Sequence, residues 1–334
     1  MNMKIRNFAP LLGIKALWQL WVKKGPLILS HGINSECNLR CKFCIYWGEK
    51  LKEMEKEEIF RLLDEASSLG VLIYNVWTAE PLMRKDFPEF LEHAKSLGMM
   101  TFMVTNGVLL EERVDELSSL DYLSVSVDGT KSYEKLRGTD LGKVLDGINA
   151  AIKNGIPTVI NCVLNGSNLD EIEDLIHIVE DLGIWISFEP LYEYEDISQD
   201  VWEEIGIRNP EKYRKTVDKI IELKREGSPV LNSYTYLTMI RDHYPDFHCH
   251  VNDLILHVSS NGQVENCRVY RQNMGEFEGS LSKVLESSKE GRKKRSKECK
   301  GCLFFGYAEL SLLYSLKPEV IMNCARIFRK FIRS

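Results

Sequence analysis

Apolar residues recur along the first half of the chain with two different spacings. Short apolar runs predict six strands, at residues 27–34, 71–78, 99–105, 122–128, 156–164 and 184–190. Apolar residues at helical spacing lie between these runs and predict helices at residues 55–70, 87–98, 110–120, 141–155 and 169–183. Several of these helical segments end in Gly, the usual residue just past a helix C-terminus.

Strands that alternate with helices indicate parallel β-α units. Six units fit an α/β fold, either a partial (β/α)6 TIM-like barrel or a doubly wound sheet. In both folds the reactive groups lie at the C-terminal ends of the strands, so we expect a functional site there.

The pattern changes after residue 190. A charged helix is expected near residues 213–226, and Asn261-Gly262 between two β-rich runs predicts a hairpin. The basic run at residues 290–302 is predicted to be a solvated linker. We therefore expect an N-terminal amphipathic segment, a barrel core, a helical connection and a small C-terminal Cys-rich α+β domain, at residues 1–26, 27–195, 196–247 and 248–334.

The residues before the first strand form a distinct segment. From Leu11 to Val22 apolar residues dominate, including Trp18 and Trp21, and lysines flank or interrupt them. This composition suits a helix that lies in a membrane interface. Because most amphipathic helices turn their apolar stripe toward a protein core, packing against the rest of the chain is the default expectation. No apolar stretch approaches the roughly 20 residues that cross a bilayer.

Composition narrows the class of protein. Of the 334 residues, 44% are hydrophobic and 28% are charged, as in ordinary globular proteins. A formal charge of -6 gives no reason to expect nucleic acid as a partner. The chain contains nine cysteines and its start lacks a secretory signal, which predicts a reducing, cytoplasmic location. Metal or redox chemistry then explains the cysteines better than a disulfide framework.

Cys37, Cys41 and Cys44 follow directly on the first predicted strand. Three thiolates at this spacing can surround one metal centre. A cubane iron-sulfur cluster usually takes four cysteines, so three would leave one iron open to a small molecule. A zinc site with His31 or a distant cysteine as fourth ligand is the structural alternative, and the spacing favours the open cluster.

The Cys-x3-Cys-x2-Cys spacing, with Phe43 before the last cysteine, resembles the signature of the radical SAM superfamily. Further similar segments lie within residues 27–190, at residues 78–82, 105–107, 124–129 and 137–138. The resemblance implies that the three cysteines bind a [4Fe-4S] cluster whose open iron chelates S-adenosylmethionine (SAM). The SAM contacts that it implies are Phe43, Glu80, Asn106, Ser126 and Arg137.

The implied SAM contacts include opposite charges. Arg137 offers a forked donor to the SAM carboxylate and Glu80 an acceptor to its ammonium, so each pole of this zwitterion has a partner. Ser126 is implied to contact the ribose or the carboxylate. Thr78 and Ala79 stand where the family usually has two glycines, which is a departure from its pattern.

A second set of cysteines lies in the C-terminal segment. Cys249, Cys267 and the pair Cys299 and Cys302 resemble the twitch domain, a shortened SPASM extension found on many radical SAM enzymes. The resemblance implies one auxiliary [4Fe-4S] cluster with four cysteine ligands, and zinc in the same site is the alternative. Two further cysteines, Cys162 and Cys324, are expected to be small core residues.

The resemblance also implies an activity. Such an enzyme cleaves SAM reductively to a 5'-deoxyadenosyl radical, which takes hydrogen from an unreactive C–H bond. Two substrates are considered: a peptide or protein side chain, and a membrane-lipid chain. The lipid hypothesis rests on the Trp-containing N-terminal segment and on the basic amphipathic end at residues 325–334.

The expected partners follow from this chemistry. An external electron donor such as ferredoxin or flavodoxin would reduce the cluster, and residues 1–24 would make peripheral contact with the inner face of a membrane. The alternatives to an enzyme are a non-catalytic iron-sulfur electron carrier and a zinc-stapled binding module.

Overall fold

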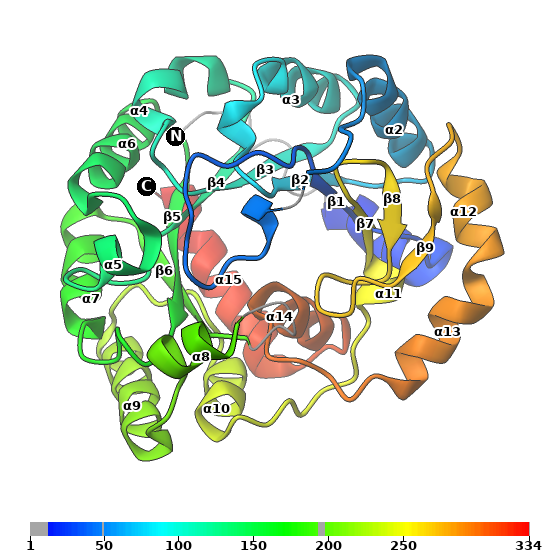
Figure 1. Cartoon of the computed structure of the whole chain (residues 1–334). Coiled ribbons are helices and arrows are strands. Elements are labelled where there is room, and N and C mark those ends of the chain that lie inside the picture. The colour runs from blue at the N-terminus through cyan, green and yellow to red at the C-terminus, as the bar shows by residue number, and fades with distance from the viewer. Residues whose placement is uncertain (1–12, 49, 193–197, 334) are drawn as a thin grey trace.

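A nine-stranded sheet organises the chain, in the order β6-β5-β4-β3-β2-β1-β7-β8-β9 (Figure 1). The structure is a computed structural model that describes residues 13–48, 50–192 and 198–333. Its strands are β1 (Ile28–Gly32), β2 (Ile73–Trp77), β3 (Met100–Thr105), β4 (Tyr122–Ser126), β5 (Thr158–Leu164), β6 (Trp185–Pro190), β7 (Ile255–Val258), β8 (Gln263–Glu265) and β9 (Asn273–Glu276). Strands β6 to β1 and β7 pair in parallel, and β8 and β9 extend the sheet antiparallel.

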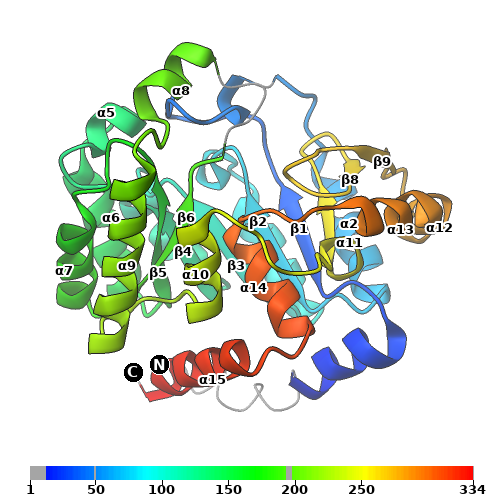
Figure 2. The same ribbon diagram turned by 90° about the horizontal axis from the view of Figure 1, so that it is seen from below.

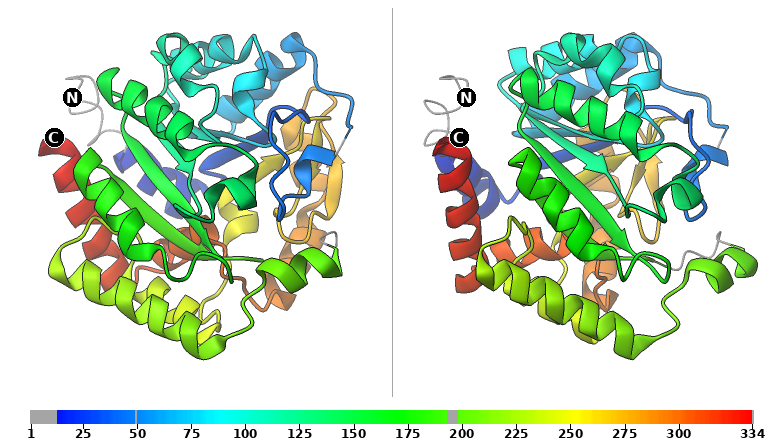
Figure 3. Two further views of the ribbon diagram at one scale, coloured as in Figure 1. Left: turned by 60° about the vertical axis from the view of Figure 1, so that its left-hand side comes forward. Right: turned by 90° about the vertical axis from the view of Figure 1, so that its left-hand side faces the viewer.

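Helices connect the strands and cover the outer face of the curved sheet (Figures 1 and 3). The barrel helices are α2 (Lys56–Ser68), α3 (Phe87–Ser96), α4 (Leu110–Arg113), α5 (Tyr133–Arg137), α6 (Leu141–Lys153) and α7 (Ile172–Leu182). The later helices are α8 (Gln199–Ile205), α9 (Pro210–Glu226), α10 (Tyr234–Asp242), α11 (Val251–Leu254), α12 (Leu281–Ser287), α13 (Lys289–Glu298), α14 (Phe305–Tyr314) and α15 (Pro318–Arg333). Four further short elements are the π-helix η1 (Trp18–Lys23) and the 3-10 helices η2 (Tyr46–Gly48), η3 (Pro81–Met83) and η4 (Val114–Leu117).

The predicted open barrel is therefore confirmed, and the doubly wound alternative is excluded because the sheet curls into an incomplete ring (Figure 1). Burial alternates along the strands: in β3, Thr101, Met103 and Thr105 are buried, while the residues between them are partly exposed. Helix α2 packs its apolar stripe on the sheet, and a capping box of Glu55 and Glu58 fixes its start.

Three local predictions were wrong. The segment 110–120 is not one helix but α4 followed by the 3-10 turn η4. The basic run at residues 290–302 is mostly helix α13, an exposed helix with polar residues all round, which periodicity does not detect. Cys324 is exposed on α15, whereas Cys162 is buried on β5 as expected.

The predicted hairpin is confirmed, whereas two other predictions concern residues outside the described part of the chain. The hairpin at Asn261-Gly262 is present, with Gly262 at φ 84°. Residues 1–12 of the N-terminal segment and the predicted boundary at residue 195 lie outside the described residues. No helix in the described part is long and apolar enough to cross a membrane.

The free edge of β6 is closed by a non-strand segment. The backbone of Ile186 donates to Pro229 and accepts from Leu231, at 2.9 and 2.7 Å. Next to them, the fully buried amide of Asn232 bonds both backbone groups of Phe188: its Oδ1 accepts from the N–H and its Nδ2 donates to the carbonyl, each at 2.8 Å. Asn232 thus replaces the missing neighbour strand at this position, since an unpaired buried backbone group is costly.

We expect Asn232→Leu to lower the free energy of unfolding by about 2 kcal/mol or more, because it leaves both backbone groups of Phe188 buried without partners. Denaturant unfolding monitored by circular dichroism measures this change. Asn154→Leu is the matched control, since Asn154 bonds Ala150 at an exposed helix end; its effect should stay within about 0.5 kcal/mol. Equal effects of the two variants would contradict the edge-closing role.

Candidate functional site

The cysteine loop begins where β1 ends and folds back on itself. The Leu39 N–H lies 3.4 Å from the Cys37 sulfur, and the Cys44 N–H donates to the Cys41 carbonyl at 3.1 Å. Burial raises the pKa of the Cys41 thiol to about 11, and negative charge on Cys44 and Cys37 would act in the same direction. The three thiols are thus near enough to influence one another at the C-terminal end of the barrel.

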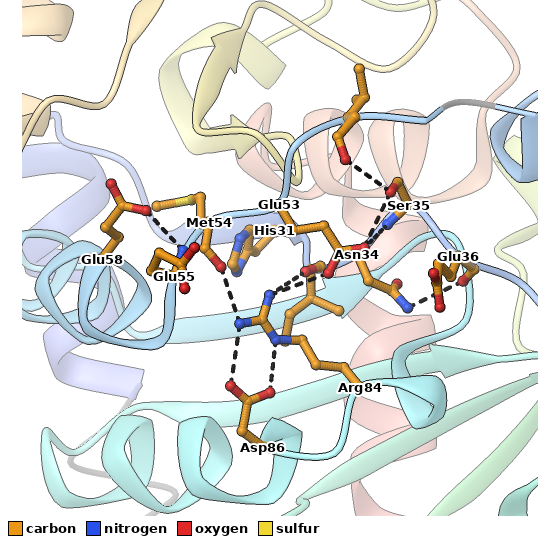
Figure 4. A network of polar contacts seen from close by, with 12 residues as sticks. His31, Asn34, Ser35, Glu36, Glu53, Met54, Glu55, Glu58, Arg84 and Asp86 are labelled. Atoms are coloured by element: carbon orange, nitrogen blue, oxygen red, sulfur yellow. Dashed lines mark hydrogen bonds and ion pairs between the residues drawn. The ribbon is translucent and has the colours of Figure 1, made fainter.

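One guanidinium holds both ends of this loop (Figure 4). Arg84 donates to the Ile33 carbonyl at 3.2 Å, before the cysteines, and to the Met54 carbonyl at 3.1 Å, after them. It also forms a two-point ion pair with Asp86, at 2.8 and 3.2 Å, and lies 3.7 Å from Glu53. Because Arg84 sits just after η3, it fixes the loop to the end of β2.

Glu80 ties β2 to β3 at the same edge of the sheet. Its carboxylate is fully buried and accepts from the Leu82 N–H at 3.1 Å, the Thr105 hydroxyl at 2.7 Å and the Asn106 N–H at 2.8 Å. Burial raises the pKa of Glu80, and these hydrogen bonds oppose that shift. Both carboxylate oxygens therefore already have protein donors, and the contact of Glu80 with the SAM ammonium stays a prediction.

Asn106 and Arg137 connect the barrel strands to the cysteines. The Asn106 amide donates to Asn38 at 2.7 Å and lies 3.8 Å from the Cys37 sulfur. Arg137 is buried, with Nε 2.5 Å from the Asp128 carboxylate and Nη1 3.8 Å from the Cys41 sulfur. The structure thus brings these two predicted SAM contacts against the thiols.

The remaining predicted contacts lie nearby. The Phe43 ring is stacked by the Arg137 guanidinium, 5.4 Å from its centroid. Ser126 ends β4 and is partly exposed; it is in register with Asn161 of β5, and its carbonyl accepts from the Tyr133 hydroxyl at 3.3 Å. Their roles toward SAM also stay predictions.

The four C-terminal cysteines converge on one site. An interaction between Cys249 and Cys299 raises the pKa of the first thiol and lowers that of the second. Burial raises the pKa of Cys302 to about 12, with the charges of Cys267 and Cys299 adding to the shift. The Tyr270 N–H lies 3.4 Å from the Cys267 sulfur. Chain segments that are far apart in sequence therefore supply one set of thiols.

Both cysteine sets suit iron-sulfur clusters. Among residues 13–48, 50–192 and 198–333, no three His, Cys, Asp or Glu side chains are arranged to hold a single metal ion. A four-iron cluster is larger than one ion, and its sulfurs are commonly hydrogen-bonded, as the N–H groups directed at Cys37 and Cys267 would allow. His31, considered as a zinc ligand, is fully buried with its Nδ1 3.0 Å from the Tyr74 hydroxyl, so it is placed with Tyr74 instead.

A cavity of about 150 Å³ borders Cys44 of the first cysteine set and Phe304, two residues after Cys302 of the second. Its walls come from the cysteine loop, from the ends of β5 and β6, and from the segment before α14; they are Phe43, Cys44, Ile45, Tyr46, Val163, Glu189, Pro190, Leu191, Tyr192 and Phe304. The lining is mainly apolar and aromatic. Glu189 is its only acid among the described residues, and burial raises the pKa of this carboxyl.

Glu189 and Arg268 are functional candidates that the sequence reasoning missed. Glu189 accepts from Asn161 at 2.9 Å and from the Phe305 N–H at 3.1 Å, which joins β6 to α14. Arg268 follows Cys267 and reaches back into the barrel, where it stacks 3.3 Å from the Trp77 ring centroid and donates to Ser30 at 2.7 Å. An acid at the C-terminal end of a predicted strand was the available signal for Glu189; Arg268 had none.

A comparison with protein families agrees with this geometry. The profile described as the radical SAM superfamily matches residues 33–179, which include the cysteine loop and β2 to β5. Residues 33–179 are a radical SAM domain. 

Two curated relatives match about half of this chain. The chain is 34% identical over 181 residues to GTP 3',8-cyclase of Alkaliphilus oremlandii, covering 50% of this chain and 57% of the relative. It is 34% identical over 164 residues to the probable GTP 3',8-cyclase of Thermococcus kodakarensis, covering 46% of this chain and 53% of the relative. The chain therefore matches little more than half the length of these relatives.

Solved radical SAM structures share the fold over a longer span. SuiB of Streptococcus suis bound to SAM superposes with a TM-score of 0.65 at 17% identity, over 78% of this chain and 66% of that one. The protein anSMEcpe with bound SAM gives 0.67 at 18% identity, over 89% of this chain and 98% of that one. At these identities the similarity establishes the fold alone.

We expect Arg84→Gln to lower the amount of iron bound after anaerobic reconstitution, because both ends of the cysteine loop lose their shared anchor. The unfolding free energy should also fall by about 2–4 kcal/mol, as a mostly buried ion pair loses one partner. Iron analysis and the visible absorption spectrum measure the first effect. Arg61→Gln, on the exposed side of α2, is the matched control; full iron content in Arg84→Gln would contradict the anchoring role.

Proposed function

We propose that this chain is a radical SAM enzyme that removes a hydrogen atom from an unreactive C–H bond of an apolar group held in the 150 Å³ cavity. The observation that carries the proposal is the position of this cavity, which is bordered by Cys44 and Phe43 of the cysteine loop and by Phe304 near the second cysteine set. A [4Fe-4S] cluster on Cys37, Cys41 and Cys44 would supply the electron that cleaves SAM to the 5'-deoxyadenosyl radical.

The chain's own residues would bind and orient SAM. Arg137, fixed by Asp128, places permanent positive charge beside Cys41 and favours the thiolate that a cluster needs. Phe43, Glu80, Asn106 and Ser126 remain the proposed further contacts. The aromatic walls of the cavity would exclude water, so that a reactive radical meets only the bound substrate.

The second cysteine set is proposed to hold an auxiliary [4Fe-4S] cluster. Cys249, Cys267, Cys299 and Cys302 provide the four thiolates of a closed site, and zinc is the alternative occupant. Arg268 links this site to Trp77 and Ser30 of the barrel. An external donor such as ferredoxin or flavodoxin is proposed to deliver the electrons.

The cavity favours an apolar substrate group over a nucleotide. The curated relatives are named for GTP, and a triphosphate needs Arg or Lys as partners. Among the described residues that line the cavity there is neither. An apolar wall with one partly buried acid, Glu189, suits an aliphatic or aromatic group, including one next to an amine.

A peptide or protein side chain is the substrate we favour. The solved structures with this fold include SuiB bound to its precursor peptide SuiA and anSMEcpe with a bound peptide, with TM-scores of 0.64 and 0.65. A lipid chain is the second candidate, because the cavity walls are apolar and the described terminal helices expose apolar side chains.

We expect the anaerobically reconstituted chain to form 5'-deoxyadenosine from SAM when a strong reductant is added. Cys41→Ala should abolish the product because the cluster loses a ligand, and Cys324→Ala, on exposed α15, should not. Liquid chromatography with mass spectrometry quantifies the product. Full iron content without 5'-deoxyadenosine would refute the enzyme and leave an iron-sulfur electron carrier.

The auxiliary site has a separate stoichiometric test. The reconstituted chain should contain about eight iron atoms, and Cys302→Ala about four, because only the four-cysteine site is lost. Cys324→Ala should keep about eight. If zinc occupies the second site, the unaltered chain would hold about four iron atoms and one zinc, and Cys302→Ala would lose the zinc alone.

The substrate class can be read from hydrogen transfer. Deuterated peptide and lipid fractions are incubated with the reconstituted chain, SAM and reductant, and deuterium is measured in 5'-deoxyadenosine. Transfer from the peptide fraction alone supports the favoured class, and transfer from the lipid fraction alone supports the second.

A further inference from the structure

Exposed apolar side chains gather on the two terminal helical segments. Eleven large hydrophobic side chains are exposed in the described part of the chain, and eight belong to residues 14–22 and 316–322. These eight are Ile14, Leu17, Trp18, Trp21, Val22, Leu316, Ile321 and Met322. We call this surface the terminal face. Single exposed apolar residues are ordinary, but a gathered set marks an interaction surface.

The two segments lie together at one end of the molecule. Trp21 of η1 stacks on Tyr314, the last residue of α14, with ring centroids 5.7 Å apart and planes 5° from parallel. Helix α15 begins four residues later. Figures 2 and 3 both show η1 and α15 as neighbours, and Figure 2 places them at the opposite end of the strands from the cysteine loop.

The N-terminal segment buries a polar residue and leaves most of its large apolar side chains exposed. Its buried residue is Gln19, whose amide donates to the carbonyls of Pro26 and Leu69 at 2.9 Å each. Trp18 and Val22 are 56% and 57% exposed. The default expectation of an apolar stripe packed on the protein is therefore met only in part: Leu20 packs on a second core cluster and Trp21 on Tyr314, while the other large apolar side chains of the segment are exposed.

Helix α15 is attached in a similar way. Its buried Asn323 accepts from Lys224 and donates to the Leu231 carbonyl, at 2.9 Å each. Glu319 accepts from the N–H groups of Tyr234 and Thr235 at the start of α10. These polar anchors leave Ile321 and Met322 on the outside. Both segments thus present apolar side chains that the described protein does not cover.

The terminal face is also positively charged. Residues 13–27 contain three lysines, Lys15, Lys23 and Lys24, and no acid, and all three are exposed. Lys317 and Arg326 are exposed on α15 and the residues just before it. The one acid among residues 316–326, Glu319, accepts a hydrogen bond from the Tyr234 N–H at the start of α10. The whole chain has a formal charge of -6, so this local excess runs against the overall sign.

We propose that the terminal face docks onto an anionic membrane surface. Tryptophan and apolar side chains enter the headgroup region of a bilayer, while neighbouring lysines and arginines bind anionic lipids. A second copy of the chain fits the face less well, because a two-fold contact would place the same basic residues opposite one another. The proposal does not depend on the catalytic function proposed above.

Vesicle flotation of the full chain tests the proposal. We expect binding to vesicles rich in phosphatidylglycerol, weaker binding to phosphatidylcholine alone, and loss of the difference at high salt. Trp18→Ser combined with Val22→Ser should weaken binding roughly tenfold or more. Tyr244→Ser, an aromatic residue 66% exposed outside the terminal face, is the matched control and should bind like the unaltered chain.

Charge and folding are checked separately. Lys15→Glu combined with Lys23→Glu should reduce binding to phosphatidylglycerol while leaving the weak binding to phosphatidylcholine, and circular dichroism of each variant shows that it is folded. Unaltered flotation of the Trp18 and Val22 variant would overturn the proposal. So would sedimentation showing a stable dimer that the same two substitutions dissociate, because a second copy would then cover the face.

Discussion

The candidate site depends on the ionic and hydrogen-bonded anchoring of one loop by Arg84. A loop that leaves the barrel at Ile33 and returns at Met54 would otherwise pay a large conformational entropy cost to hold three thiols together. One guanidinium, oriented by Asp86, bonds both ends and reduces that freedom before any cofactor binds. Glu80 acts at the same edge of the sheet by joining β2 to β3, so the thiols and the proposed SAM contacts share one rigid base.

The second cysteine set is positioned by the same sheet. Strand β7, which follows Cys249, pairs directly with β1, which precedes Cys37. The contacts of Arg268 with Trp77 and Ser30 add a side-chain link across this pairing. Because a paired strand cannot shift without breaking its hydrogen bonds, this pairing fixes the segments that lead to Cys37 and Cys249 relative to each other. Helix α14 and Glu189 close the opposite side of the cavity.

The sequence predicted those features that depend on residues close together in the chain. The six barrel strands are buried on both faces or alternate strictly, so their sequences are distinctive, and the cysteine spacing needs only eight residues of context. The role of Arg84 was not predictable, because its partners lie 30 and 51 residues away. The burial of Gln19 was not predictable for a similar reason: the carbonyl of Leu69 that it bonds lies 50 residues along the chain. Buried polar anchoring of this kind has no periodic signature.

The separation between the terminal face and the cysteine loop has a consequence for access. They lie at opposite ends of strands of five to seven residues, which span about 20 Å. A molecule resting on a bilayer through the terminal face would therefore direct the mouth of the barrel toward the aqueous phase. Such contact would act as a tether that orients the enzyme for water-borne electron donors and peptides, and a lipid chain could enter only after leaving the bilayer.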